Sequence, residues 1–165
     1  MHNQSLIVKM GLLNWEGQLK RTTSLLNTLT DEQLSQEIAP GRNTGAYLIG
    51  HLIAVHDAIV PLFGLGEKLH PELEEIYITT PDKSGKKTPS IPQLREYWKE
   101  VHGHLEQRLA SLTDEQWLQR HMSVSEEDFQ KEPHRNKLNV LISRAIHISY
   151  HLGQLVLLKS QFEKG

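Results

Sequence analysis

Two histidines near the C-terminal end of the sequence have the spacing of a metal-binding pair. His147 and His151 lie four residues apart in a stretch that is otherwise strongly apolar. On an α-helix, side chains four residues apart project from one face with β-carbons about 6 Å apart, so two imidazoles can converge on one divalent cation. The residue after His147 is Ile148 and not the glutamate of H-E-x-x-H metalloproteases. The pair therefore lacks the general base of that protease class.

His51 is a third histidine that could join this pair. It is one of the few polar residues in the apolar run 46–65, which we predict to be a helix buried on most sides. A polar group buried without a hydrogen-bonding partner costs about 1 to 3 kcal/mol, so His51 needs a dedicated partner inside the fold. The spacing of His147 and His151 alone also fits two histidines that are only packed or hydrogen-bonded. A third imidazole favours a divalent-metal site formed by His51, His147 and His151.

The remaining histidines are expected to have other roles. His56 lies about 140° from His51 around a helix, because five residues turn it by five steps of roughly 100°, so both cannot reach one cation. We expect His56 and Asp57 to be packed, hydrogen-bonded groups that are structural or support the site from behind. Six further histidines are expected to be solvated: His2, His70, His102, His104, His121 and His134.

The composition limits the chemistry that is available. The 165 residues include no cysteine, so a metal must be held by nitrogen and oxygen ligands and any sulfur nucleophile must come from outside the chain. With 18 Lys and Arg against 20 Asp and Glu, the net charge of -2 gives no electrostatic basis for binding nucleic acid or an anionic membrane. The first residues lack the basic region of a secretory signal, so a cytoplasmic location is expected.

Apolar residues that recur every three or four positions predict four long helices. These helices span about residues 5–27, 43–63, 91–112 and 137–162. A threonine followed three residues later by glutamine, at Thr30 and again at Thr113, predicts two short capped turns. Residues 64–92 are rich in glycine and proline, and we expect a long crossover loop there that is either a lid or a solvated connector.

The sequence also contains a weak internal repeat. Residues 29–34 read LTDEQL and residues 112–117 read LTDEQW, and the dipeptide Arg-Asn precedes both the second and the fourth long helix. Each half is then a long helix, a short capped turn, a loop and a second long helix, as in two stacked helical hairpins. We predict one all-α domain over residues 1–165, a four-helix bundle with a pseudo-twofold repeat and a long crossover loop.

The histidine motifs resemble those of the DinB-like (DinB/YfiT-type) superfamily of four-helix-bundle metalloproteins. The likeness rests on N-x-x-x-Y-L-I-x-H-L, which begins at Asn43, and on H-x-x-x-H-x-G-Q, which begins at His147. In that family one histidine of the second helix and two of the fourth bind a divalent cation, which implies this role for His51, His147 and His151. Many members have arginine after the last ligand, where this chain has Leu152. The resemblance therefore supports the metal site more strongly than any substrate contact through that arginine.

An open metal site would explain the enzymatic activities known in this family. Three imidazoles leave at least one coordination position free, as in catalytic zinc sites. Zinc, nickel, iron or manganese in such a site can activate water, orient an incoming thiol or polarise an electrophile. Family members of known activity include transferases and isomerases that use a low-molecular-weight thiol, others are described as hydrolases, and homodimers are common.

We therefore predict a homodimeric, metal-dependent enzyme for a small-molecule substrate. The reaction would be either hydrolysis or S-transfer with an exogenous low-molecular-weight thiol. Gln154 and Tyr150, close to His151 on the same predicted helix, are candidate catalytic or substrate-contacting residues. The alternative is a non-catalytic stress-response or interaction bundle in which the metal only tightens the helices.

Overall fold

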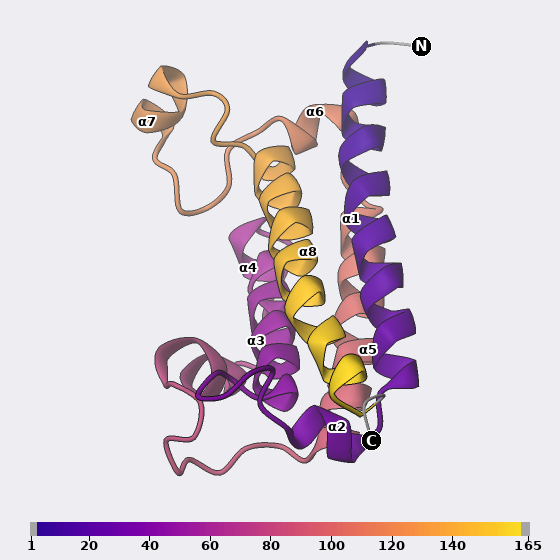
Figure 1. The fold of residues 1–165 in the computed structure, drawn as a ribbon. Helices are drawn as coiled ribbons and strands as arrows, with labels where there is room; N and C mark the ends of the chain where they lie inside the picture. The colour runs from indigo at the N-terminus through magenta and orange to yellow at the C-terminus, as the bar shows by residue number, and fades with distance from the viewer. Residues whose placement is uncertain (1–2, 163–165) are drawn as a thin grey trace.

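The structure is a computed structural model that describes residues 3–162. All the secondary-structure elements assigned in this part of the chain are helices. The four long helices are α1 Asn3–Thr28, α3 Gly45–Asp57, α5 Ile91–Leu109 and α8 Lys137–Phe162. In Figure 1, α1 and α8 run in one direction while α3 and α5 run in the other. Helix α1 packs along α8, α3 packs along α5, and α3 also contacts α8. The predicted all-α class is confirmed.

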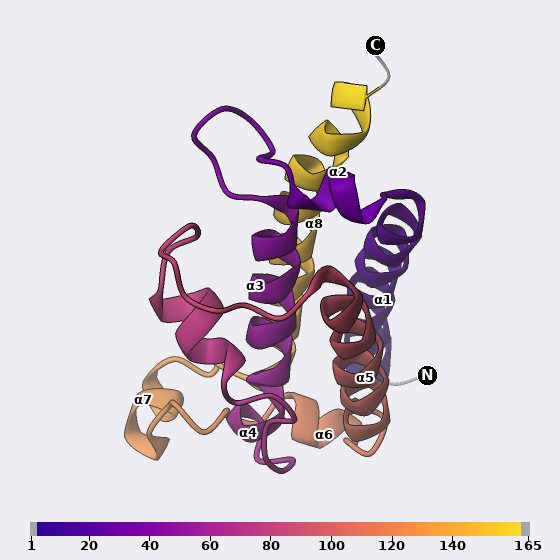
Figure 2. The same ribbon diagram turned by 90° about the horizontal axis from the view of Figure 1, so that it is seen from below.

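Short helices connect the long ones. They are α2 Asp31–Ser35, α4 Ile59–Leu62, the π-helix η1 Glu75–Thr79, α6 Asp114–Trp117 and α7 Glu126–Lys131. Thr30 and Thr113 cap α2 and α6, each in a reciprocal pair with the glutamine three residues later, as predicted. Figure 2 shows α7 away from the long helices, in a segment for which the sequence analysis predicted no helix.

The predicted second long helix is interrupted. Helix α3 ends at Asp57, Ala58 forms a turn, and α4 continues only to Leu62. Pro61 explains the break, because it has no amide hydrogen to donate to the carbonyl oxygen four residues earlier. Residues Gly45–Leu62 are long and apolar enough to cross a membrane by length and composition alone, but 61% of this stretch is buried inside the fold. That burial is typical of a core helix.

The two halves of the chain share local details beyond their capped turns. An isolated antiparallel bridge joins Glu37 to Thr44 just before α3, and a second one joins Arg120 to Asn136 just before α8. The Thr44 side chain accepts a hydrogen bond from a backbone N–H in the first turn of α3, and Asn136 does the same for α8. The two helices that carry the predicted ligands therefore begin in a similar way, each with a bridge and a side-chain N-cap.

The crossover segment packs against α3. Tyr77 of η1 is buried and lies over Gly50, where a β-carbon would come within 2.4 Å of the tyrosine ring. The buried Asp57 carboxylate at the end of α3 accepts the backbone N–H groups of Leu69 and His70 at 2.9 and 2.8 Å. A simple solvated connector does not describe this part of the segment, because it forms one wall of the region around His51.

Candidate metal centre

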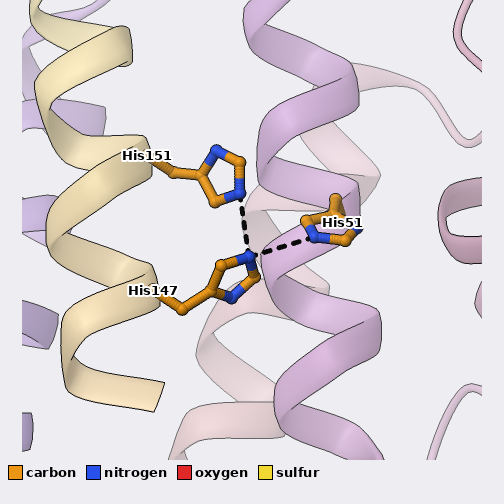
Figure 3. A group of neighbouring side chains, drawn as sticks. All are labelled: His51, His147 and His151. Carbon is orange, nitrogen blue, oxygen red and sulfur yellow. Dashed lines mark hydrogen bonds between the residues drawn. The ribbon is translucent and has the colours of Figure 1, made fainter. Parts of the chain in front are cut away.

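Three imidazoles meet between α3 and α8. Figure 3 shows His51 projecting from α3 toward His147 and His151, which lie one turn apart on α8. The Nε2 atom of His147 is 3.2 Å from that of His51 and 2.9 Å from that of His151. One ring nitrogen from each histidine lies within 4.8 Å of the other two, a grouping that can hold a metal ion. The structure thus brings together the three residues that the sequence singled out.

A backbone carbonyl fixes the orientation of His51. Its Nδ1 lies 2.9 Å from the carbonyl oxygen of Tyr77. A carbonyl oxygen can only accept, so Nδ1 must carry the hydrogen and Nε2 must present its lone pair. Tyr77 belongs to the π-helix η1, and such short π-helical turns are frequent at functional sites. No local sequence pattern points to this partner, because the two residues are 26 positions apart.

Gln154 orients His151 in the same way. The Oε1 atom of Gln154 accepts a hydrogen bond from Nδ1 of His151 at 2.6 Å, which leaves the lone pair of His151 on Nε2. The Gln154 Nε2 atom in turn lies 3.5 Å from the Tyr150 hydroxyl. Tyr150 is 64% exposed and its ring stands edge-on to His151 with centroids 5.1 Å apart. Gln154 therefore supports a candidate ligand directly, whereas Tyr150 faces outward beside it.

This arrangement of protons fits a shared cation. His51 and His151 both aim Nε2 lone pairs at Nε2 of His147, and a single imidazole hydrogen at that atom could satisfy only one of them well. A divalent cation would be attracted to all three lone pairs at once. Ligand nitrogens around tetrahedral zinc lie about 3.3 Å apart, close to the two shorter separations here. The donor set and its supporting hydrogen bonds therefore fit a divalent metal.

The surroundings of His147 and His151 favour the neutral imidazole, which is the form that binds metal. Burial lowers the pKa of His147 to about 4, helped by the neighbouring His151, His51 and Arg144. Burial also lowers the pKa of His151, while the hydrogen bond that His151 donates to Gln154 opposes this shift. Protons therefore compete less well with a metal ion here than at an exposed histidine.

A hollow of about 300 Å³ borders the site on the side of His151. It lies between the loop before α3 and the second half of α8. The residues lining it are Ile38, Gly41, Arg42, Asn43, Leu48, Tyr150, His151 and Gln154. Both residues predicted to contact substrate thus line one hollow that adjoins a candidate ligand.

Behind the site, His56 and His102 form a buried pair. Nδ1 of His56 lies 2.6 Å from Nε2 of His102, and Nδ1 of His102 lies 2.7 Å from the carbonyl oxygen of Trp98. The carbonyl requires the hydrogen on Nδ1 of His102, so His56 donates to His102. The packed, hydrogen-bonded role expected for His56 is confirmed. The expectation that His102 is solvated was wrong, because it is only 4% exposed on the face of α5 that meets α3.

The other histidines differ in exposure. His134 is exposed, as expected, whereas His70, His104 and His121 are half-buried. The ring of His70 packs on Tyr97 at 3.8 Å and bonds to Glu100 at 3.0 Å. His2 lies outside the described residues.

Comparison with known proteins agrees with this geometry. The family model of the DinB superfamily matches residues 14–155, which include all three clustered histidines. The chain therefore belongs to the DinB superfamily. A search of curated proteins found no match.

Proposed function

We propose that this protein is a divalent-metal-dependent enzyme that activates water or an exogenous low-molecular-weight thiol. His51, His147 and His151 would hold the ion. The proposal is carried by one observation, the convergence of three Nε2 atoms, two of which are fixed as lone-pair donors by Tyr77 and Gln154. When bound, such an ion lowers the pKa of a coordinated water or thiol and polarises an electrophile.

The protein's own groups would position the reactants. Three histidine ligands leave room for a further ligand, and this chain has no cysteine to occupy it. The hollow beside His151 would bind the body of a small molecule, with Gln154 holding the ligand ring and Tyr150 offering a hydroxyl at the rim. Hydrolysis and S-transfer both remain within this proposal because they need the same open position.

The competing function is a structural one, in which the metal only stabilises the helices. The buried His56–His102 pair shows that this fold does use histidines for internal support. A fourth ligand supplied by protein would favour this alternative, whereas exchangeable water would favour an enzyme.

A metal analysis combined with a conjugation assay tests the proposal. The purified protein should contain close to one divalent ion per chain, and His147→Ala should lose it, while His134→Ala at an exposed position should keep it. The loaded protein is then assayed for thiol conjugation with several electrophiles and for ester hydrolysis. Full metal content without turnover in any assay would support the structural alternative.

We also propose that the four long helices form a four-helix bundle with a pseudo-twofold repeat. The support comes from the matching capped turns at Thr30 and Thr113 and from the matching bridges before α3 and α8. Superposing residues 3–62 on residues 91–158 in an experimental structure tests this, and the two halves should overlay helix for helix.

We further propose that the protein forms a homodimer through α1 and α8. These adjacent helices expose a stripe of large apolar side chains formed by Leu6, Ile7, Met10, Leu13, Ile142 and Ile146. A second copy of the chain would bury this stripe. Light scattering should give a dimeric mass that Met10→Glu converts to a monomer, while Met122→Glu, at a more exposed methionine elsewhere, leaves the dimer intact.

A further inference from the structure

Arg144 is a partly buried cation that has no ion-pair or hydrogen-bonding partner among the described residues. It lies on α8 three residues before His147, so both side chains project from neighbouring positions on one face. Its Nε atom is buried and makes no hydrogen bond, and no carboxylate in the described part of the chain lies within ion-pair distance of its side chain. Burying a charge without a counterion or hydrogen bonds costs free energy. An anionic ligand that pairs with the Arg144 guanidinium would remove this cost.

Two imidazole nitrogens near Arg144 are unpaired as well. The Nδ1 atoms of His147 and His121 are both buried and have no hydrogen-bonding partner among the described residues. With its Nε2 lone pair given to a metal ion, His147 would carry its hydrogen on Nδ1 and have it free to donate. His121, Arg144 and His147 are each only half-buried, so a small ligand can reach this region from solvent.

The charged groups that act on His121 are positive, and of these Arg135 is paired with Glu132 at 3.1 Å. The pKa of His121 is lowered by burial first and then by Arg135, Lys137 and Arg144. Lys137 is itself buried and contacts the backbone carbonyl oxygens of Gln116 and Arg120, and none of the described carboxylates hydrogen-bonds to it. A surface with several cations and few compensating carboxylates attracts anionic ligands.

We propose that Arg144 binds the oxyanion group of a small substrate whose reacting end lies at the three-histidine site. The guanidinium is suited to this task because its planar fork pairs with the two oxygens of a carboxylate or phosphate. Arg144 lies about one helical turn before His147 on α8, so a short carbon spacer would separate an oxyanion at its guanidinium from a reacting group at the histidines. This inference rests on the proposed function and names the substrate class for the same site.

Thiol binding to the cobalt-loaded protein tests the inference. The probes are 3-mercaptopropionate, which carries a carboxylate, and 2-mercaptoethanol, which is neutral, and the readout is the thiolate-to-cobalt absorption band. The wild-type protein should bind 3-mercaptopropionate at least about tenfold more tightly. Arg144→Gln should abolish this preference and leave 2-mercaptoethanol binding unchanged, Arg144→Lys should restore part of it, and Arg21→Gln on the exposed face of α1 should keep it.

Equal affinities of the wild-type protein for the two thiols, or a preference that survives in Arg144→Gln, would overturn the inference. Thermal unfolding of Arg144→Gln checks that the variant is folded. If cobalt binds but neither thiol changes the spectrum, the open position required by the proposed function is missing.

A second measurement tests anion binding by Arg144 even if no thiol binds to the cobalt ion. The NMR signal of the Arg144 Nε–H group, assigned by its loss in Arg144→Gln, should shift on titration with propionate or with inorganic phosphate. The anion with the tighter binding identifies the group that the site prefers. An unchanged signal with both anions counts against the inference whatever the cobalt spectrum shows.

Discussion

The Nδ1 atom of His51 donates a hydrogen bond to the backbone carbonyl oxygen of Tyr77, 2.9 Å away. This bond connects a candidate ligand on α3 to the π-helical turn of the crossover segment. The tyrosine reaches this position because Gly50 has no side chain to keep the ring away. Close packing of the crossover segment therefore sets the direction of the His51 lone pair.

Gly50→Ala tests this connection. The added methyl group would meet the Tyr77 ring at 2.4 Å and must displace it or α3. We expect an overpacking cost of about 1 to 3 kcal/mol in the free energy of unfolding. The metal affinity should fall by about 10- to 100-fold, because the displaced carbonyl no longer orients His51. Isothermal titration with zinc and urea unfolding measure the two effects.

Gly153→Ala is the matched control for this substitution. Gly153 also lies within a long helix, but it is exposed and a β-carbon there would have no atom within 4 Å. Alanine should raise the stability by up to about 1 kcal/mol through its helix propensity and leave the zinc affinity unchanged. An equal loss of affinity in both variants would show that Tyr77 does not orient His51.

Gln154 should act on the metal through His151. Gln154→Ala removes the acceptor 2.6 Å from Nδ1 of His151, and we expect the zinc affinity to fall by about 10- to 100-fold. Gln154→Glu retains an acceptor oxygen and should restore most of the affinity. If Gln154 contacts only substrate, turnover would fall in Gln154→Ala while the zinc affinity stayed at the wild-type value.

Metal occupancy should depend on pH. Imidazole must be neutral to bind, so protons displace the ion once the pH falls below the ordinary histidine pKa of about 6.5. Burial, followed by the nearby positive groups, lowers the pKa of His147 to about 4, which shifts half-release below that reference value. Equilibrium dialysis between pH 7.5 and 4 measures the curve. Full occupancy at the acid end of this range would argue against three histidine ligands.

The buried His56–His102 pair should make the stability of the metal-free protein fall in acid. Burial lowers the pKa of His102 to about 4, so the unfolded chain takes up a proton at higher pH than the folded chain does. The stability from the neutral pair is present in full above about pH 6.5 and is lost as the pH falls toward 4. For His102 alone the loss is about 2 kcal/mol by pH 5.

Urea unfolding of the wild type and of His102→Gln at pH 7 and pH 5 measures this effect. The variant lacks the titrating ring, so its stability should change less between the two pH values. Equal changes in both proteins would mean that His102 does not titrate differently in the folded and unfolded states.

Local patterns in the chain were enough to predict the four long helical segments, apart from the break in the second, and the candidate ligands. Periodic apolar residues and capping side chains act within one or two turns, so the long helices and the caps at Thr30 and Thr113 follow from neighbouring residues. The pairing of His51 with the two histidines of α8 also followed, because a buried imidazole must find a partner. His102 had a readable signal too, since it lies four residues after Trp98 and three before Leu105, both of which are buried.

Contacts between distant segments required the tertiary structure. The carbonyl of Tyr77 lies beside His51 only because the crossover segment folds back onto α3, and no local pattern encodes that approach. Whether Arg144 has a partner likewise depends on all the segments that surround it. None of their described residues places a carboxylate beside its side chain. Side-chain type and spacing define which groups can bind a metal, whereas hydrogen-bond direction and charge compensation depend on which surfaces meet in space.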